Sequence, residues 1–103
     1  MKTNEINEDI IYKIRDMLSI ASDMTRLKIL FSLLDKDRNE KCVGQIVEDT
    51  KASQSLVSHQ LKVLRNFDLV STRRDGKKIY YSLKDDHVRQ LIRVAYEHAT
   101  EEE

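Results

Sequence analysis

The chain has 103 residues, of which 18 are basic and 18 acidic, so its formal net charge is zero, and it contains one cysteine. This length suits one small domain, which we take to span residues 1–103. No apolar run approaches the roughly 20 residues that cross a bilayer, the first residues are too polar for a secretory signal, and a single cysteine excludes an internal disulfide. We therefore expect a cytoplasmic protein without a membrane partner.

The charge is unevenly distributed along the chain. Residues 1–50 carry a net charge of −2, residues 51–84 carry +6, and residues 85–103 carry −4. A basic segment between two acidic ones predicts a local surface that can meet the phosphates of a nucleic acid.

Helical periodicity dominates the first part of the chain. One apolar stripe runs over residues 6–18. A second, over residues 27–34, follows the i, i+3, i+4, i+7 spacing, and Ser22 or Asp23 is placed to cap its start.

Two more helices follow. A short one is expected over residues 43–47, and the next begins after Ser53 and has Val57, Leu61 and Leu64 on its apolar side. The opposite side of this fourth helix carries short hydrogen-bonding and basic groups, as a recognition helix in the DNA major groove requires. The ordinary solvated face of a surface helix is the alternative for each residue taken singly.

The periodicity then changes. Residues 69–83, LVSTRRDGKKIYYSL, are two β-prone runs joined by Asp75-Gly76, a dipeptide suited to the positive φ angles of a hairpin turn. A last helix is expected from about Asp86 to His98 or a little beyond. Its apolar side would carry Val88, Leu91, Ile92, Ala95 and Ala99.

This order of elements predicts a mainly α fold with a small β-hairpin, arranged as a winged helix-turn-helix. The hairpin would be the wing, and its basic residues would neutralise phosphate. The candidate DNA-binding residues are Gln54, Ser55, Ser58, His59 and Lys62 on the fourth helix, and Arg73, Arg74, Lys77 and Lys78 on the hairpin.

Four stretches resemble the ArsR/SmtB family of metal-responsive bacterial transcriptional repressors. They are TRLKILFSLL, CVGQI, SQSLVSHQLKVLRNFDLV and GKKIYYSL, and the resemblance covers residues 22–101. It implies a homodimeric repressor with N- and C-terminal dimerisation helices, which occupies double-stranded operator DNA until an inducer binds.

The last helix carries the candidate metal ligands Asp85, His87, His98 and Glu101. Eleven residues make about three helical turns, so both histidines point to the same side, but they lie about 16 Å apart along the helix, too far to share one ion. Two antiparallel copies related by a two-fold axis would bring Asp85 and His87 of one chain to His98 and Glu101 of the other.

Two imidazoles and two carboxylates suit a tetrahedral Zn²⁺ ion. The spacing D-x-H-x10-H-x2-E resembles the C-terminal-helix site of the zinc-sensing branch of the family. Other readings stay open: Asp85 can simply cap the helix, His98 can interact with the helix dipole, and Glu101 can belong to a frayed acidic tail. The same fold could also respond to cobalt, nickel or a non-metal signal.

An enzyme is not expected. The four ligands would fill a tetrahedral shell and leave no position for an activated water, and the sequence lacks a glycine-rich phosphate loop, a nucleophile elbow and an H-E-x-x-H motif.

Cys42 is interpreted as a buried thiol that packs like a small hydrophobic residue. In the arsenic- and cadmium-sensing branches of the family, a C-x-C motif here supplies two thiolates. In this chain the second position is Gly44, and residues 1–41 contain no cysteine or histidine. A dithiol site is therefore not expected, although a disulfide between two chains stays open.

Linkage supplies the expected mechanism: if zinc binds the dimer more tightly without DNA, DNA binds more weakly with zinc, by the same coupling free energy. The family resemblance further implies that His98 donates its second ring proton to the main chain at about Asp68.

Overall fold

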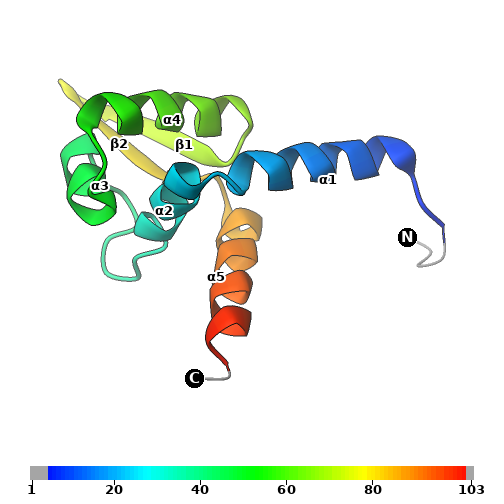
Figure 1. Cartoon of the computed structure of the whole chain (residues 1–103). Helices are drawn as coiled ribbons and strands as arrows, with labels where there is room; N and C mark the ends of the chain where they lie inside the picture. The colour runs from blue at the N-terminus through cyan, green and yellow to red at the C-terminus, as the bar shows by residue number, and fades with distance from the viewer. Residues whose placement is uncertain (1–4, 102–103) are drawn as a thin grey trace.

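The computed structural model describes residues 5–101 as five helices and one antiparallel hairpin (Figure 1). In chain order the elements are α1 (Glu8–Ala21), α2 (Met24–Ser32), α3 (Val43–Thr50), α4 (Gln54–Asn66), β1 (Val70–Asp75), β2 (Lys78–Leu83) and α5 (Asp86–Thr100). The expected mainly α fold with a small hairpin is confirmed.

Four helices begin at a side chain that caps them. Asn7, Asp23, Ser53 and Asp85 each accept a hydrogen bond from the backbone N–H three residues later, at 3.0 to 3.2 Å. Such caps satisfy donors that have no partner within the helix. Of the two candidate caps for α2, Asp23 is the one used.

A single apolar core lies among α2, α3, α4 and the strands. On α4, Val57, Leu61 and Leu64 are fully buried, as expected. On α2 the fully buried residues are Ile29 and Leu30. The expected stripe over residues 27–34 was therefore only partly right, because its other members lie half-buried at the rim of the core.

The hairpin turn lies one residue later than expected. Asp75 pairs with Lys78 as the last pair of the ladder, so the two-residue loop is Gly76-Lys77 and not Asp75-Gly76. Gly76 has φ +62°, which suits the first central position of a type II′ turn, where glycine is preferred.

The wing is fastened to the loop between α2 and α3. Lys41 and Tyr81 exchange two backbone hydrogen bonds of 2.9 Å, which form an isolated antiparallel bridge beside β2. The Lys41 side chain is buried, and its Nζ donates to the Ser32 carbonyl at 2.7 Å and to Asp49 Oδ2 at 2.6 Å. One lysine thus joins β2, α2 and α3.

Helices α1 and α5 project from this body in different directions (Figure 1). The radius of gyration is 14.8 Å, whereas about 13 Å is usual for a compact domain of this length. On α5 only Val88 and Ile92 are buried, so the rest of its expected apolar side is not covered within one chain. In residues 5–101, no helix is long and apolar enough to cross a membrane.

Candidate nucleic-acid interface and metal-binding half-sites

The candidate base-reading residues lie on the exposed face of α4. All five of them are solvent-exposed, and they begin in the first turn of the helix, opposite its buried side. Helix α4 follows α3 after a turn of residues 51–53, in which Lys51 has φ +61° and donates its N–H to the Val47 carbonyl at 2.8 Å. This tight turn positions the N-terminus of α4 at the surface of the molecule.

The wing carries three exposed basic side chains. Arg74 is on β1, Lys77 is in the turn, and Lys78 begins β2. The hairpin lies alongside α4 (Figure 1), and a shallow cavity of about 250 Å³ between them is lined by Ser58, Leu61, Lys62, Arg65 and Tyr81. Helix α4 and the wing therefore lie side by side, and each exposes polar or basic side chains.

Arg73 differs from the other wing residues because it is paired. Its Nε and Nη2 donate to the two carboxylate oxygens of Glu40 at 2.9 and 3.0 Å, and its guanidinium lies 4.7 Å from the centre of the Tyr80 ring. This pairing lowers the pKa of Glu40 and raises that of Arg73. Sequence reasoning missed Glu40, which is 33 positions away and is brought to the wing only by the fold.

The four candidate metal ligands lie in two exposed pairs on α5. Asp85 caps the helix through its contact with Val88 N–H, and His87 follows in the first turn. At the other end, His98 Nδ1 lies 3.4 Å from Glu101 Oε1. No three His, Cys, Asp or Glu side chains come together to hold a metal within residues 5–101. Within one chain the four candidates therefore form two separate pairs, one at each end of α5.

The expected hydrogen bond from His98 to the main chain at Asp68 is not made within one chain. Asp68 lies near the start of α5, where its carboxylate is 3.8 Å from Lys84 Nζ. His98 lies in the last turn of the same helix, about 20 Å further along its axis.

Cys42 is only half-buried, which corrects the expectation of a buried thiol. It is the residue that precedes α3, and its backbone N–H donates to Gln45 Oε1 at 2.9 Å. A position at the end of a helix leaves the side chain at the edge of the core. It lines a cavity of about 450 Å³ together with Lys77, Lys78 and Tyr81.

The three packed helices α2, α3 and α4, followed by a hairpin beside α4, define a winged helix-turn-helix protein. A family model described as bacterial regulatory protein, arsR family, matches residues 23–72. The chain is 41% identical to a transcriptional repressor SmtB homolog from Synechocystis sp., over 84% of this chain and 63% of that protein. This chain therefore spans less than two thirds of that relative.

A second relative is matched over most of its length. The chain is 33% identical to a cadmium resistance transcriptional regulatory protein CadC homolog from Staphylococcus aureus, over 97% of this chain and 84% of that protein. Among solved structures, HlyU from Vibrio cholerae superposes with a TM-score of 0.79 at 32% identity, covering 87% of this chain and 95% of that one.

The chain belongs to the ArsR family of bacterial regulatory proteins. Its named relatives are regulators of transcription and not enzymes, which agrees with the expectation from the sequence.

Proposed function

We propose that the chain is a homodimeric transcriptional repressor that binds operator DNA and releases it when zinc binds between the two subunits. The observation that carries the DNA-binding part is that α4 and the neighbouring wing both expose polar and basic side chains. Helix α4 offers short hydrogen-bonding side chains to base edges, and the wing offers Arg74, Lys77 and Lys78 to phosphates.

The homodimer is supported by apolar side chains that one chain leaves exposed on α1 and α5. On α1 they include Ile10, Ile14 and Leu18, which recur every four residues and are 40–49% exposed. On α5, Leu91 and Val94 lie on the same side as His87 and are 37% and 60% exposed. Apolar surface of this extent is favourable to remove from water, and a second copy of the same two helices would cover it.

The donor set fits zinc. Asp85 and His87 of one subunit, with the partner's His98 and the partner's Glu101, would supply two carboxylates and two imidazoles, all exposed in one chain. Asp85 uses Oδ1 for its helix cap, and a carboxylate retains further lone pairs for a metal. When bound, the metal would supply a cross-link between the two α5 helices, with two such sites in each dimer.

A path of hydrogen bonds connects the start of α5 to the end of α4. The Lys84 N–H, one residue before Asp85, donates to the Leu69 carbonyl at 3.0 Å, and the Leu69 N–H donates to the Leu64 carbonyl at 2.9 Å. A change in the position of α5 would therefore reach the C-terminal end of the recognition helix. In the dimer, the partner's His98 would lie beside Asp68, so the implied bond between them would join two subunits.

Another inducer is the alternative. The likeness to a cadmium resistance regulator makes cadmium a metal to test, and cobalt, nickel and non-metal signals remain to be compared with zinc. A single thiol in the chain disfavours a site of several thiolates, which soft metals prefer.

The test begins with an operator selected from a random-sequence duplex library. Fluorescence anisotropy then measures its affinity for the protein alone and with each metal at equal free concentration. Zinc should weaken operator binding by about 5- to 150-fold, as a coupling free energy of about 1–3 kcal/mol predicts. Selection of no preferred sequence would contradict the DNA-binding role, and an equal affinity with and without zinc would contradict the inducer.

A further inference from the structure

Arg26 lies where three helices meet. It is in the first turn of α2 and is half-buried. Its Nε donates to the Ile20 carbonyl, in the last turn of α1, at 2.7 Å, and its Nη1 donates to Gln60 Oε1, on α4, at 2.8 Å. One side chain therefore connects the projecting helix α1 to the recognition helix.

The end of α1 needs such a donor. The last four carbonyls of a helix have no partner within it and carry partial negative charge, which a nearby cation stabilises. The last turn of α1 contains no basic residue, so Arg26 supplies the cation from the next helix. Because the guanidinium group is rigid and planar, its hydrogen bonds to Ile20 and Gln60 also fix the end of α1 relative to α4.

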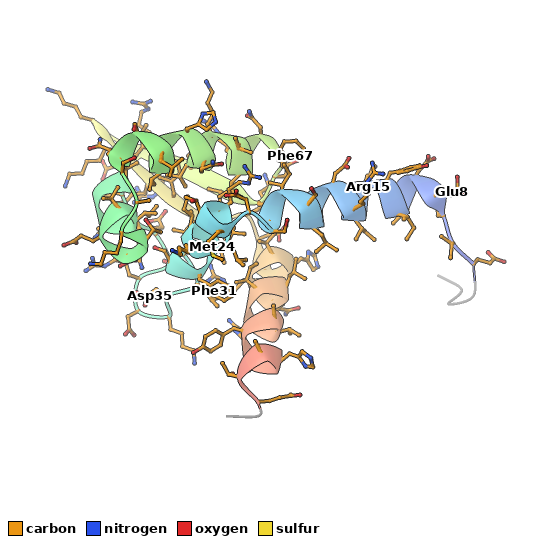
Figure 2. The ribbon with its side chains drawn as sticks, in the orientation of Figure 1. Glu8, Arg15, Met24, Phe31, Asp35 and Phe67 are labelled. Carbon is orange, nitrogen blue, oxygen red and sulfur yellow. The ribbon has the colours of Figure 1, made fainter. Side chains whose placement is uncertain are left out.

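Away from this point, α1 and α4 separate. An open cavity of about 390 Å³ lies between Lys13, Asp16 and Met17 of α1 and Asn66, Phe67 and Asp68 at the end of α4. Figure 2 shows Phe67 above α1, while Arg15 and Glu8 lie further out along the helix. The cavity separates the outer part of α1 from the end of α4, and Arg26 lies where the two helices are connected.

A small change of this angle has a large effect at the far end of α1. A helix of 14 residues is about 21 Å long, so a rotation of about 10° at the pivot moves its far end by about 3.6 Å. One base-pair step along DNA is about 3.4 Å. If two copies pair near the middle of α1, each recognition helix would move by about half that distance, and the separation of the two would change by about one base-pair step.

We propose that Arg26 is a positioning residue that sets the angle between α1 and α4, and through it the separation of the operator half-sites that the dimer accepts. This inference rests on the proposed function, in which a homodimer reads two half-sites.

The experiment compares wild type with Arg26→Lys and Gln60→Leu. Lysine keeps the charge but lacks the fork, whereas Gln60→Leu removes the acceptor on α4 and leaves the bond to Ile20. Arg38→Lys, at an exposed position between α2 and α3, is the matched control. Affinities are measured on duplexes whose half-sites are one base pair closer, at the selected separation, or one base pair further apart, and on a duplex with one half-site.

Wild type and Arg38→Lys should prefer the selected separation by about 10-fold, a difference of about 1.4 kcal/mol. Arg26→Lys and Gln60→Leu should bind the single half-site like wild type but prefer the selected separation by less than about 3-fold. If Arg26→Lys does not fold, Gln60→Leu alone gives the same test.

Two results would overturn the inference: an unchanged preference for half-site separation in both variants, or an equal loss of affinity on every duplex, which a merely structural role would cause. Failure of the proposed function is a separate result, because wild type itself would then show no preferred separation.

Discussion

Glu40 changes what the wing offers to DNA. Its carboxylate accepts hydrogen bonds from two of the three guanidinium nitrogens of Arg73, so the positive charge of this arginine is partly neutralised, unlike that of its neighbour Arg74. A phosphate that approaches the wing competes with Glu40 for the same donors. In the proposed DNA complex Arg73 would therefore contact phosphate only after leaving Glu40, whereas Arg74, Lys77 and Lys78 would be available at once.

Glu40→Gln should strengthen binding to random-sequence duplex DNA by a few-fold, because the competing negative charge is removed and Arg73 becomes free for phosphate. Neutralising one further phosphate should steepen the plot of log affinity against log salt concentration by about 0.9. Anisotropy titrations over a range of salt concentrations measure both quantities. Weaker binding with an unchanged slope would show instead that the ion pair is needed to hold the wing in place.

Base reading and phosphate contact should separate on α4 and the wing. Gln54→Ala or Ser58→Ala should weaken operator binding by about 1–3 kcal/mol and leave random DNA almost unaffected. Lys77→Ala or Lys78→Ala should weaken both alike and flatten the salt dependence by about one unit for each phosphate that is no longer neutralised. Zinc binding by the free dimer should stay the same, and Lys36→Ala, exposed on the loop between α2 and α3, serves as the charge control.

A Gln54 or Ser58 variant that loses operator and random DNA equally would show that α4 does not read bases. An unaltered salt slope in both lysine variants would remove the wing from the interface.

At the scale of elements, the buried Lys41 joins the wing, α2 and α3. Besides Asp49, its Nζ contacts Asp35 Oδ2 at 3.3 Å. The hydrogen bond from Lys41, followed by that from Ser32, lowers the pKa of Asp49 below its ordinary value of 3.8. The pKa of Asp35 is lowered chiefly by the backbone N–H of Asp37 and then by Lys41.

These lowered pKa values predict a dependence of stability on pH. A carboxyl whose pKa is lower in the folded state stabilises the fold above its unfolded pKa, and that stabilisation is lost as the pH falls through the folded value. Wild type should therefore lose stability below about pH 4. The Asp49→Asn variant should be less stable than wild type at about pH 7 but should lose less of its free energy of unfolding on acidification.

Urea unfolding between neutral pH and about pH 3 measures this difference. Glu48→Gln, at an exposed position on the same helix, should follow wild type throughout. Parallel curves for wild type and Asp49→Asn would show that the Asp49 carboxylate does not contribute to the pH dependence.

The elements were predictable because their signals are local. The caps Asp23 and Ser53 lie next to the helices that they start, and the burial of α4 follows from a 3.6-residue period. The predicted turn was wrong by one residue. Asp75-Gly76 and Gly76-Lys77 both place glycine at a central position of a two-residue loop, and only the pairing register of the strands decides between the two loops.

The connections between elements were not predictable from spacing. Arg73 meets Glu40 across 33 positions, and Arg26 meets Gln60 across 34. No periodicity links such residues, because the tertiary fold alone brings them together. The candidate metal ligands were a different case, since helical spacing placed His87, His98 and Glu101 on one side of α5, but within one chain the four candidates form only two separate pairs.

At the scale of the whole molecule, the exposed apolar side of α1 predicts a dimer. Ile14→Glu places a charge in the middle of this side, and burying that charge without a partner is costly. The variant should be monomeric at micromolar concentration and bind the two-half-site operator at least about 10-fold more weakly. Sedimentation equilibrium and anisotropy measure the two effects.

Ser19→Glu places the same charge on the opposite, exposed side of α1 and should remain dimeric. A dimeric Ile14→Glu variant would show that α1 does not form the subunit interface.

The central claim is that zinc is held by residues of two subunits and thereby releases DNA. In the proposed dimer, one site combines His87 of one subunit with His98 of the partner subunit, and the second site combines the reciprocal pair. His87→Ala and His98→Ala homodimers each lose a ligand from both sites. A mixed dimer of the two variants concentrates both losses in one site and keeps the other site complete.

The decisive measurement is a zinc titration of the operator complex, followed by anisotropy, for wild type, both homodimeric variants and the mixed dimer made by co-expression with two different affinity tags. We predict that neither variant homodimer releases DNA at the zinc concentration sufficient for wild type, and that the mixed dimer regains binding of one zinc ion and part of the release. Release from either variant homodimer at the wild-type zinc concentration, or a mixed dimer that binds no more zinc than its parents, would contradict the account.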